Sequence, residues 1–425
     1  MNRRVFLKAG GLSLVTLGLT PSFLRRTALA MDLPRAARGK TLIVLFQRGA
    51  ADALNVVVPF GDANYYAARP QLAIGSPARV TGAAGAIDLN GYFGLHPAMS
   101  PLKPLWDRGL LAPIHAVGSP SSTRSHFDAQ DYMETGTPDR KGTADGWLNR
   151  YLAVKGTCEA CAVGDKPVNT PFRAVAMTAQ MPRILEGPSP TVAMNSIEEF
   201  SIRTTGGEAE KRLEALYRTG SADMVHGSGT EMFEALRVLR AANPQQYKPA
   251  AGVEYPRSQF GQRLLSIAQL IKAGVGLEVA FADIGGWDTH VNQGAAQGQL
   301  AQRLGDFSGS IAALVADLGD RMDDVVILTM SEFGRTVRQN GTGGTDHGHA
   351  GAMFVIGGSL KTPRKVLGRW PGLAPEQLYE GRDLALTTDF RSVFSELAAK
   401  HLGAGSLDRI FPGYATPERG WLGVL

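Results

Sequence analysis

The sequence contains very little cysteine: only Cys158 and Cys161 occur in 425 residues. Two thiols cannot form a four-cysteine zinc site. A thioredoxin-type C-x-x-C normally follows a strand and opens a helix, whereas this pair lies in the Gly/Pro-rich stretch KGTCEACAVGDKP. In an oxidising compartment, the pair is expected to form a local loop disulfide.

Several common functional motifs are also missing. The chain has no P-loop, no G-x-G-x-x-G, no H-E-x-x-H and no G-x-S-x-G. These absences exclude a conventional nucleotide-binding loop, a zincin helix and a standard hydrolase elbow. The apolar run near the N-terminus, AGGLSLVTLGLTPSFL, is about sixteen residues long and therefore short for the roughly 30 Å hydrocarbon core of a bilayer.

That apolar run belongs to a leader-like segment. It follows the charged stretch MNRRVFLKAG and precedes the small-residue signature Ala28-Leu29-Ala30. This order indicates a secretory leader, and the twin arginine indicates the Tat route. We therefore expect handling by the Tat translocase, cleavage after Ala30, a linker over 31–40, a periplasmic or extracellular location and no stable membrane anchor.

Charge gives no sign of a polyanionic partner. The chain has 44 basic and 39 acidic residues, and five of the basic ones lie within residues 1–30, which contain no acid. Without that segment the chain is formally neutral. The high pI belongs to the leader, and nucleic acid is not an expected partner.

Continuous apolar runs alternate with helical patterns along the rest of the chain. Such runs are typical of strands buried in parallel sheets, and they occur at 40–47, 110–117, 172–179, 277–284, 325–330 and 352–357. Amphipathic helices are predicted at 257–274 and 300–322. We therefore predict an α/β fold with a mostly parallel central sheet covered on both faces.

Residues 41–425 are long enough for one large α/β domain. Residues 185–256 differ from the rest because they are richer in polar residues, glycine and proline. They contain two shorter helical patterns, at 196–219 and 230–241. We interpret 185–256 as an inserted helical or irregular cap on the main domain.

Polar side chains follow several of the predicted strands. In open α/β sheets, ligands bind beyond the carboxyl ends of the strands. The segments in question are RGAADALN, GSPSSTRSHFDAQD, GGWDTH and SEFGRT, together with GTGGTDHGHAGA, which leads into the last predicted strand. If these strands share one sheet, their polar groups converge on one rim.

The mixture of carboxylates and imidazoles in these segments suits a divalent ion of the zinc, manganese or iron type better than a calcium cage, which prefers oxygen alone. Asp288 and His290 are one residue apart, as are His347 and His349, so each extended pair points to one side. Satisfied polar turns are the alternative interpretation. The candidate metal ligands are Asp52, Asp288, His290, Glu332, Asp346, His347 and His349.

Ser125 is the candidate nucleophile. With Asp128 it forms an S-x-x-D pattern, so it is either a plain N-cap or a hydroxyl activated at a helix N-terminus. Thr123 is its competitor, and the neighbouring His126 joins the candidate catalytic set. Arg48 and Arg124 are candidates for holding substrate oxygens with their forked donors, and Arg335 is a further arginine of this kind.

Taken together, the motifs FQRGAADALNVVVP, GLHPAM, RSHFDAQDYMETG, GGWDTH, SEFGRT, GGTDHGHAGAMFVIGG and TTDFRSVF resemble the domain-of-unknown-function 1501 family. Members of that family are Tat-exported bacterial proteins placed in the alkaline phosphatase and sulfatase superfamily. The resemblance implies a three-layer α/β/α sandwich, a hydroxyl nucleophile and one or two metals. It places acidic and histidine ligands at Asp52, Asp288, His290 and either His347 or His349.

Two departures from the superfamily pattern are visible. Ser331-Glu332 stands where Asp-His is common, and the spacing from Asp288 to His290 is shorter than usual. We expect an exported hydrolase of phosphate or sulfate esters, acting on small molecules or glycans, with zinc as the expected ion and manganese or calcium as alternatives. A degenerate binding protein of the same fold is the first alternative. A metal-free serine esterase using Ser125 or Ser331 is the second.

Overall fold

The structure is a computed structural model, and it describes residues 39–80, 84–156, 170–198, 237–415 and 421–425. The predicted leader and cleavage site, the cysteine pair and most of the predicted helices at 196–219 and 230–241 lie outside these residues. Within them, no helix is both long enough and apolar enough to cross a membrane.

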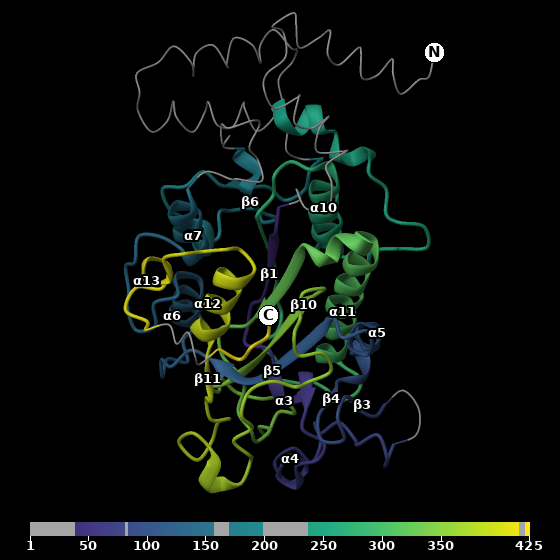
Figure 1. Cartoon of the computed structure of the whole chain (residues 1–425). Coiled ribbons are helices and arrows are strands. Elements are labelled where there is room, and N and C mark those ends of the chain that lie inside the picture. The colour runs from purple at the N-terminus through teal and green to yellow at the C-terminus, as the bar shows by residue number, and fades with distance from the viewer. Residues whose placement is uncertain (1–38, 81–83, 157–169, 199–236, 416–420) are drawn as a thin grey trace, which may run out of the picture.

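An eight-stranded sheet crosses the molecule (Figure 1). Its spatial order is β11-β5-β10-β9-β1-β8-β6-β7. The strands are β1 Thr41–Gln47, β5 Leu111–Gly118, β6 Ala174–Ala176, β7 Val192–Ala193, β8 Val279–Ile284, β9 Val325–Met330, β10 Gly351–Gly357 and β11 Thr388–Asp389. All six predicted strands are present, and one further short strand lies at each edge, β11 beside β5 and β7 beside β6.

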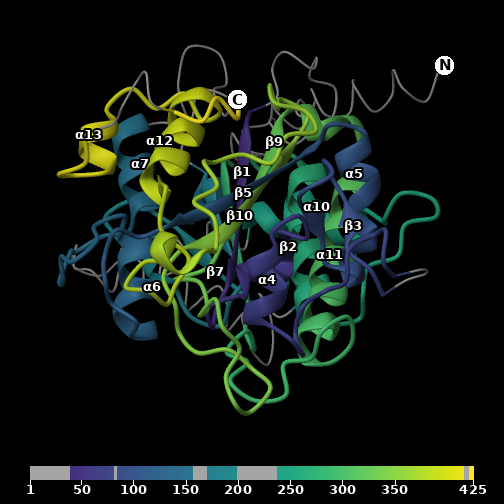
Figure 2. The same ribbon diagram turned by 90° about the horizontal axis from the view of Figure 1, so that it is seen from below.

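Helices cover both faces of this sheet (Figure 2). One core contains Ile43 and Leu45 of β1, and the other contains Leu42, Val44 and Phe46, because alternate side chains of a strand point to opposite faces. The first core packs on α5 Lys103–Asp107, α10 Gln259–Ala273 and α11 Gln299–Leu318, and the second on α6 His126–Thr135, α7 Trp147–Lys155, α12 Phe390–Lys400 and α13 Leu407–Ile410. The predicted three-layer α/β/α sandwich is confirmed.

The two long helices follow the sequence pattern closely. The Ser258 hydroxyl accepts a hydrogen bond from the backbone N–H of Gly261 at the start of α10, which ends at Gly274 in the left-handed conformation that glycine favours. The helix α11 ends at Leu318, before the predicted limit, and a 3-10 helix over Gly319–Asp323 completes the segment.

The strand β10 runs opposite to the rest of the sheet. It is antiparallel to both β5 and β9, whereas β1 is parallel to β8 and β9. Because β10 runs in the opposite direction, it begins at the rim where the other strands end. The loop 331–350, which joins β9 to β10, therefore lies at the same rim as the loops after β1, β5 and β8.

Short elements surround the main sheet. A three-stranded antiparallel sheet is formed by β2 Val57–Val58, β4 Gly94–Leu95 and β3 Ile87–Asp88, and the short helices α3 Ala53–Val56 and α4 Ala63–Ala68 lie in the same stretch. Within 185–256, β7 pairs with β6 at the edge of the main sheet, so this part of the predicted insertion belongs to the core fold.

Candidate metal centre

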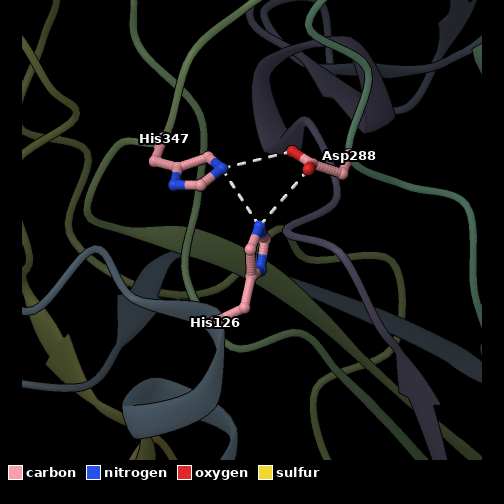
Figure 3. Close-up of side chains that lie close together, drawn as sticks. All are labelled: His126, Asp288 and His347. Carbon is pink, nitrogen blue, oxygen red and sulfur yellow. Dashed lines mark hydrogen bonds and ion pairs between the residues drawn. The ribbon is translucent and has the colours of Figure 1, made fainter.

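Four side chains from three loops meet at the rim of the sheet, and Figure 3 shows three of them. His126 is the first residue of α6, in the connection that follows β5. Asp288 and His290 lie in the loop after β8, and His347 lies in the loop that enters β10. Residues more than 200 positions apart thus share one site, because β5 and β8 end at the same rim of the sheet at which β10 begins.

Three imidazole nitrogens approach one another closely. His347 Nε2 lies 3.0 Å from His126 Nε2 and 3.0 Å from His290 Nε2. The Asp288 carboxylate completes the cluster: Oδ1 lies 3.2 Å from His347 Nε2 and 3.0 Å from His290 Nε2, and Oδ2 lies 3.5 Å from His126 Nε2. His126, Asp288 and His347 each offer one ligand atom within 4.8 Å of the others.

The opposite nitrogen of each ring has an acceptor as its partner. His126 Nδ1 lies 2.7 Å from Glu332 Oε1, and His290 Nδ1 lies 2.8 Å from Asp346 Oδ1. His347 Nδ1 lies 2.9 Å from the backbone carbonyl of Arg124. Since carboxylates and carbonyls only accept, each Nδ1 carries the proton and donates. In the neutral rings, each Nε2 therefore presents a lone pair.

Three lone pairs and a carboxylate facing one another repel unless a metal ion lies between them or one Nε2 carries a second proton. A metal-bound histidine typically donates its other N–H to a carboxylate or carbonyl, which is the arrangement of all three rings here. Ligand atoms about 2.1 Å from a tetrahedral ion lie about 3.4 Å from each other, close to the separations in this cluster. The donor set fits a divalent metal ion.

The surroundings of the two rings in Figure 3 shift their pKa values in opposite directions. The hydrogen bond to Glu332 raises the pKa of His126, with burial working against it. Burial lowers the pKa of His347. His347 is therefore the readier of the two to be neutral, and His126 is held in place by a charged partner.

The Asp288 carboxylate is kept ionised by an arginine. Burial works to raise the pKa of Asp288, but the hydrogen bond and positive charge of Arg335 outweigh it and lower the pKa. Arg335 Nη1 donates to Asp288 Oδ1 at 2.6 Å, and the Arg335 side chain is fully buried. The carboxylate is thus available as an anionic ligand.

Two glycines explain how the loops pack so closely. A Cβ on Gly344 would lie 2.3 Å from the backbone of His290, and a Cβ on Gly348 would lie 2.4 Å from the backbone of Arg335. Only glycine permits such approaches. Gly344 therefore lets this loop lie against the Asp288–His290 loop, and Gly348 lets the same loop fold back on its own backbone at Arg335.

Aromatic and apolar side chains border the cluster. The buried Phe333 ring lies 4.9 Å from the His126 ring and 5.1 Å from the His347 ring, so both imidazoles contact an apolar group. Phe127 and Val291 are the two exposed large hydrophobic residues among those described. Each directly follows a cluster histidine in the chain.

The structure places several predicted ligands differently. Asp52 is fully buried and paired with Arg69 at 2.6 Å, and none of its hydrogen bonds reaches the cluster. His349 is buried and stacks on Tyr379 with ring centroids 4.2 Å apart. Burial lowers the pKa of His349. Of the two candidate histidines in this loop, the geometry selects His347.

Glu332 and Asp346 contact the histidine rings on the side that faces away from the cluster, and they do not enter the cluster themselves. Both were expected as direct ligands, yet each carboxylate accepts from the Nδ1 of a ring whose Nε2 points into the cluster. Conversely, His126 was expected to act as a catalytic residue, and the structure makes it a candidate ligand. The sequence could not separate these roles because direct and supporting carboxylates have the same composition.

The predicted arginines are already paired. Arg48 contacts Asp283 at 2.7 Å and Glu134 at 2.8 Å, and Arg124 contacts both Asp383 and Glu380 at 2.7 Å. Neither guanidinium contacts the cluster directly, although the backbone carbonyl of Arg124 holds His347.

The candidate hydroxyls differ in accessibility. Ser125 is exposed and is the N-cap residue that precedes α6, but its side chain makes no capping hydrogen bond, and Thr123 is half-buried. Ser331, in contrast, is buried, and its Oγ donates to the carbonyl of Gln47 at 2.7 Å. Of the two serines considered for a metal-free esterase, Ser331 therefore lacks access to a substrate.

Some supporting residues escaped the sequence analysis. Gln130 donates to Glu332, and Glu134 binds Arg48; both lie on the face of α6 that carries His126. Their spacing of four residues was the available signal, since positions i and i+4 share a helix face. Gln293 and Thr345 also support the site, because the Thr345 hydroxyl donates to Gln293 and accepts from Arg335. Both lie in loops, where no helical periodicity indicates which residues lie close together.

Comparisons with known proteins give the chain its family. No curated protein matches it. Among solved structures, the lipoteichoic acid synthase LtaP from Listeria monocytogenes matches with a TM-score of 0.33 and 9% identity, over 80% of this chain and 72% of that chain. The PsFucS1 sulfatase from Pseudoalteromonas sp. matches with a TM-score of 0.32 and 12% identity, over 82% and 68%. The family described as protein of unknown function (DUF1501) matches residues 112–409, which is most of the chain, and the protein therefore belongs to that family.

Proposed function

We propose that this protein is a metal-dependent hydrolase that cleaves phosphate or sulfate esters. The observation that carries the proposal is the convergence of three imidazole Nε2 atoms and the Asp288 carboxylate, with every Nδ1 proton donated away from the centre. A cation bound between these acceptor atoms would be stabilised by all of them. Zinc is the ion proposed, because imidazole and carboxylate ligands suit it.

The ester specificity comes from the resemblance of the motifs to the alkaline phosphatase and sulfatase superfamily. A divalent metal in the cluster would act as a Lewis acid that polarises the ester and stabilises negative charge on the attacking oxygen. Glu332 and Asp346 fix the protonation of the rings they contact, and Arg335 orients Asp288. Phe333 packs against the rings of His126 and His347.

The proposed nucleophile is Ser125. Its exposed hydroxyl is one residue from His126 and at the first turn of α6, where free backbone N–H groups favour developing negative charge. Thr123 is the alternative hydroxyl. Arg124 would bind substrate oxygens by exchanging its contact with Glu380, a half-exposed carboxylate, for the substrate.

We further propose that the protein acts outside the cytoplasm. The N-terminal charged, apolar and A-x-A order supports Tat export with cleavage after Ala30. Small-molecule or glycan esters are the proposed substrates. Western blotting of periplasmic and cytoplasmic fractions, with Arg3→Lys and Arg4→Lys together as the comparison, tests this localisation.

A binding protein of the same fold is a second candidate. The pairing of Arg48 and Arg124 with carboxylates favours it, because neither guanidinium is free to hold an anion before a contact is exchanged. Such a protein would keep the metal and bind a ligand without turning it over.

One experiment separates these candidates. Protein purified without chelator is analysed for metal and assayed with aryl phosphates and aryl sulfates, in parallel with Ser125→Ala. Bound metal and turnover that disappears in Ser125→Ala support the hydrolase with its proposed nucleophile. Metal without turnover favours the binding protein. Absence of metal from the native protein, even after incubation with zinc, would refute the metal centre.

A further inference from the structure

We propose that Asp52 is a positioning residue that orients Asp288 through a chain of buried hydrogen bonds. This inference concerns the site of the proposed function and rests on it. Asp52 is fully buried, and its Oδ2 accepts from Arg69 Nη1 at 2.6 Å and from Gln293 Nε2 at 2.6 Å.

The chain continues from Gln293 to Arg335. Because the amide nitrogen of Gln293 faces Asp52, its oxygen must face away. That oxygen accepts from the hydroxyl of Thr289 at 2.8 Å and from that of Thr345 at 2.9 Å. The Thr345 hydroxyl, having donated its only proton, accepts from Arg335 Nε at 3.2 Å.

Arg335 is the last link. Its Nη2 donates to the carbonyl of Thr345, and its Nη1 donates to Asp288 Oδ1. From Arg335 to Asp52 every donor therefore points toward the negative charge of Asp52, and Arg335, which can only donate, turns its Nη1 the other way, toward Asp288. Gln293, Thr345 and Arg335 are almost completely buried, so water does not offer competing partners.

A second connection runs through Arg69. Its Nη2 donates to the carbonyl of Thr336 and its Nε to that of Val337, so the Asp52–Arg69 pair also holds the backbone that follows Arg335. Asp52 Oδ1 has no hydrogen-bond partner among the described residues. Retaining a buried carboxylate with one unsatisfied oxygen is costly, which favours a role beyond filling the core.

The test is a double-mutant cycle on metal affinity. Asp52→Asn removes the charge that orients Gln293, while Thr345→Val breaks the chain in the middle and leaves the Asp52–Arg69 pair intact. Zinc affinity of each metal-free protein is measured by competition with a chelator. We expect each single variant to bind zinc about tenfold more weakly and the double variant to be no weaker than the weaker single one.

Three further measurements keep the test decisive. Thr345→Ser keeps the hydroxyl and should bind zinc with the affinity of the native protein, in contrast to Thr345→Val. The visible spectrum of the Co²⁺-loaded protein should change in both single variants, because it reports the arrangement of ligands. If Asp52→Asn does not fold, Asp52→Asn with Arg69→Met removes the unpaired buried charge and replaces it in the cycle.

Two results would overturn the positioning role. One is zinc affinity and a Co²⁺ spectrum in Asp52→Asn that match those of the native protein. The other is losses in the two single variants that multiply in the double variant, since independent effects add as free energies. Failure of the native protein to bind either ion would instead refute the metal centre itself, so the two failures are distinguishable.

Discussion

Replacing Glu332 with glutamine tests how the cluster is held together. Glu332 Oε1 accepts three hydrogen bonds, from His126 Nδ1 at 2.7 Å, Gln130 Nε2 at 2.9 Å and the Gly49 backbone N–H at 2.8 Å. Burial works to raise the pKa of Glu332, but the hydrogen bonds from His126 and Gln130 outweigh it and lower the pKa. The residue is therefore a buried anion surrounded by donors.

Glutamine has nearly the same shape, and its amide oxygen can keep the three donors. The charge is lost, however, and the amide N–H₂ then faces the Ser331 hydroxyl, which lies 3.2 Å from Oε2. Supporting carboxylates of this kind typically contribute 10–100-fold to metal affinity. We expect Glu332→Gln to weaken zinc binding by that factor, or about 1.4–2.8 kcal/mol.

The assay is a chelator competition titration of the metal-free protein with zinc, accompanied by thermal unfolding without metal. Glu380→Gln is the matched control, because Glu380 is a half-exposed carboxylate that contacts Arg124 and no cluster histidine. The control should bind zinc like the native protein. If Glu332→Gln also binds zinc within twofold of the native protein, the argument that Glu332 holds His126 for a metal is refuted.

Three other predictions follow from the same geometry. His347→Ala should abolish zinc binding, whereas His349→Ala should change it less than twofold while lowering the free energy of unfolding by about 1 kcal/mol through loss of the Tyr379 stack; equal losses in zinc titrations would contradict the assignment. Gly344→Ala should weaken zinc binding and destabilise the fold by more than about 1 kcal/mol, because its Cβ would lie 2.3 Å from the His290 backbone, whereas Gly341→Ala, with nothing within 4 Å, should be neutral in thermal unfolding and zinc titration. Zinc affinity should fall as pH drops, because protonated imidazole cannot bind a metal. Since the hydrogen bond to Glu332 raises the pKa of His126, the loss of affinity should begin above pH ~6.5 in the native protein and at lower pH in Glu332→Gln. Zinc titrations from pH 8 to pH 5 in which both proteins lose affinity at the same midpoint pH would contradict this.

Much of the fold could be predicted from the sequence, because its signal is local. The run TLIVLFQ is apolar at every position, as expected for a strand covered on both faces, and it forms β1. The helix α10 begins at a serine cap and ends at a glycine. Such features depend on neighbours within a few residues.

The candidate site was predictable by location and less so by role. The segments GGWDTH and GTGGTDHGHAGA do meet at the rim, and His290 and His347 lie in the cluster. Which carboxylate faces the cluster and which lies behind a ring depends on side-chain directions in loops. Asp52 shows the limit most clearly, because its partner Arg69 neutralises it inside the core.

The sequence by itself determined the α/β class, the six longer strands' locations, the long helices and the set of segments that carry the chemistry, since hydrophobic periodicity and capping residues act over short distances. Tertiary structure alone decided that β10 runs antiparallel, which brings His347 to the rim where β5 and β8 end. It also decided that His126, Asp288, His290 and His347 form the cluster while Asp52, Glu332 and Asp346 support it or lie apart. These outcomes depend on contacts between residues far apart in the chain, which local patterns do not encode.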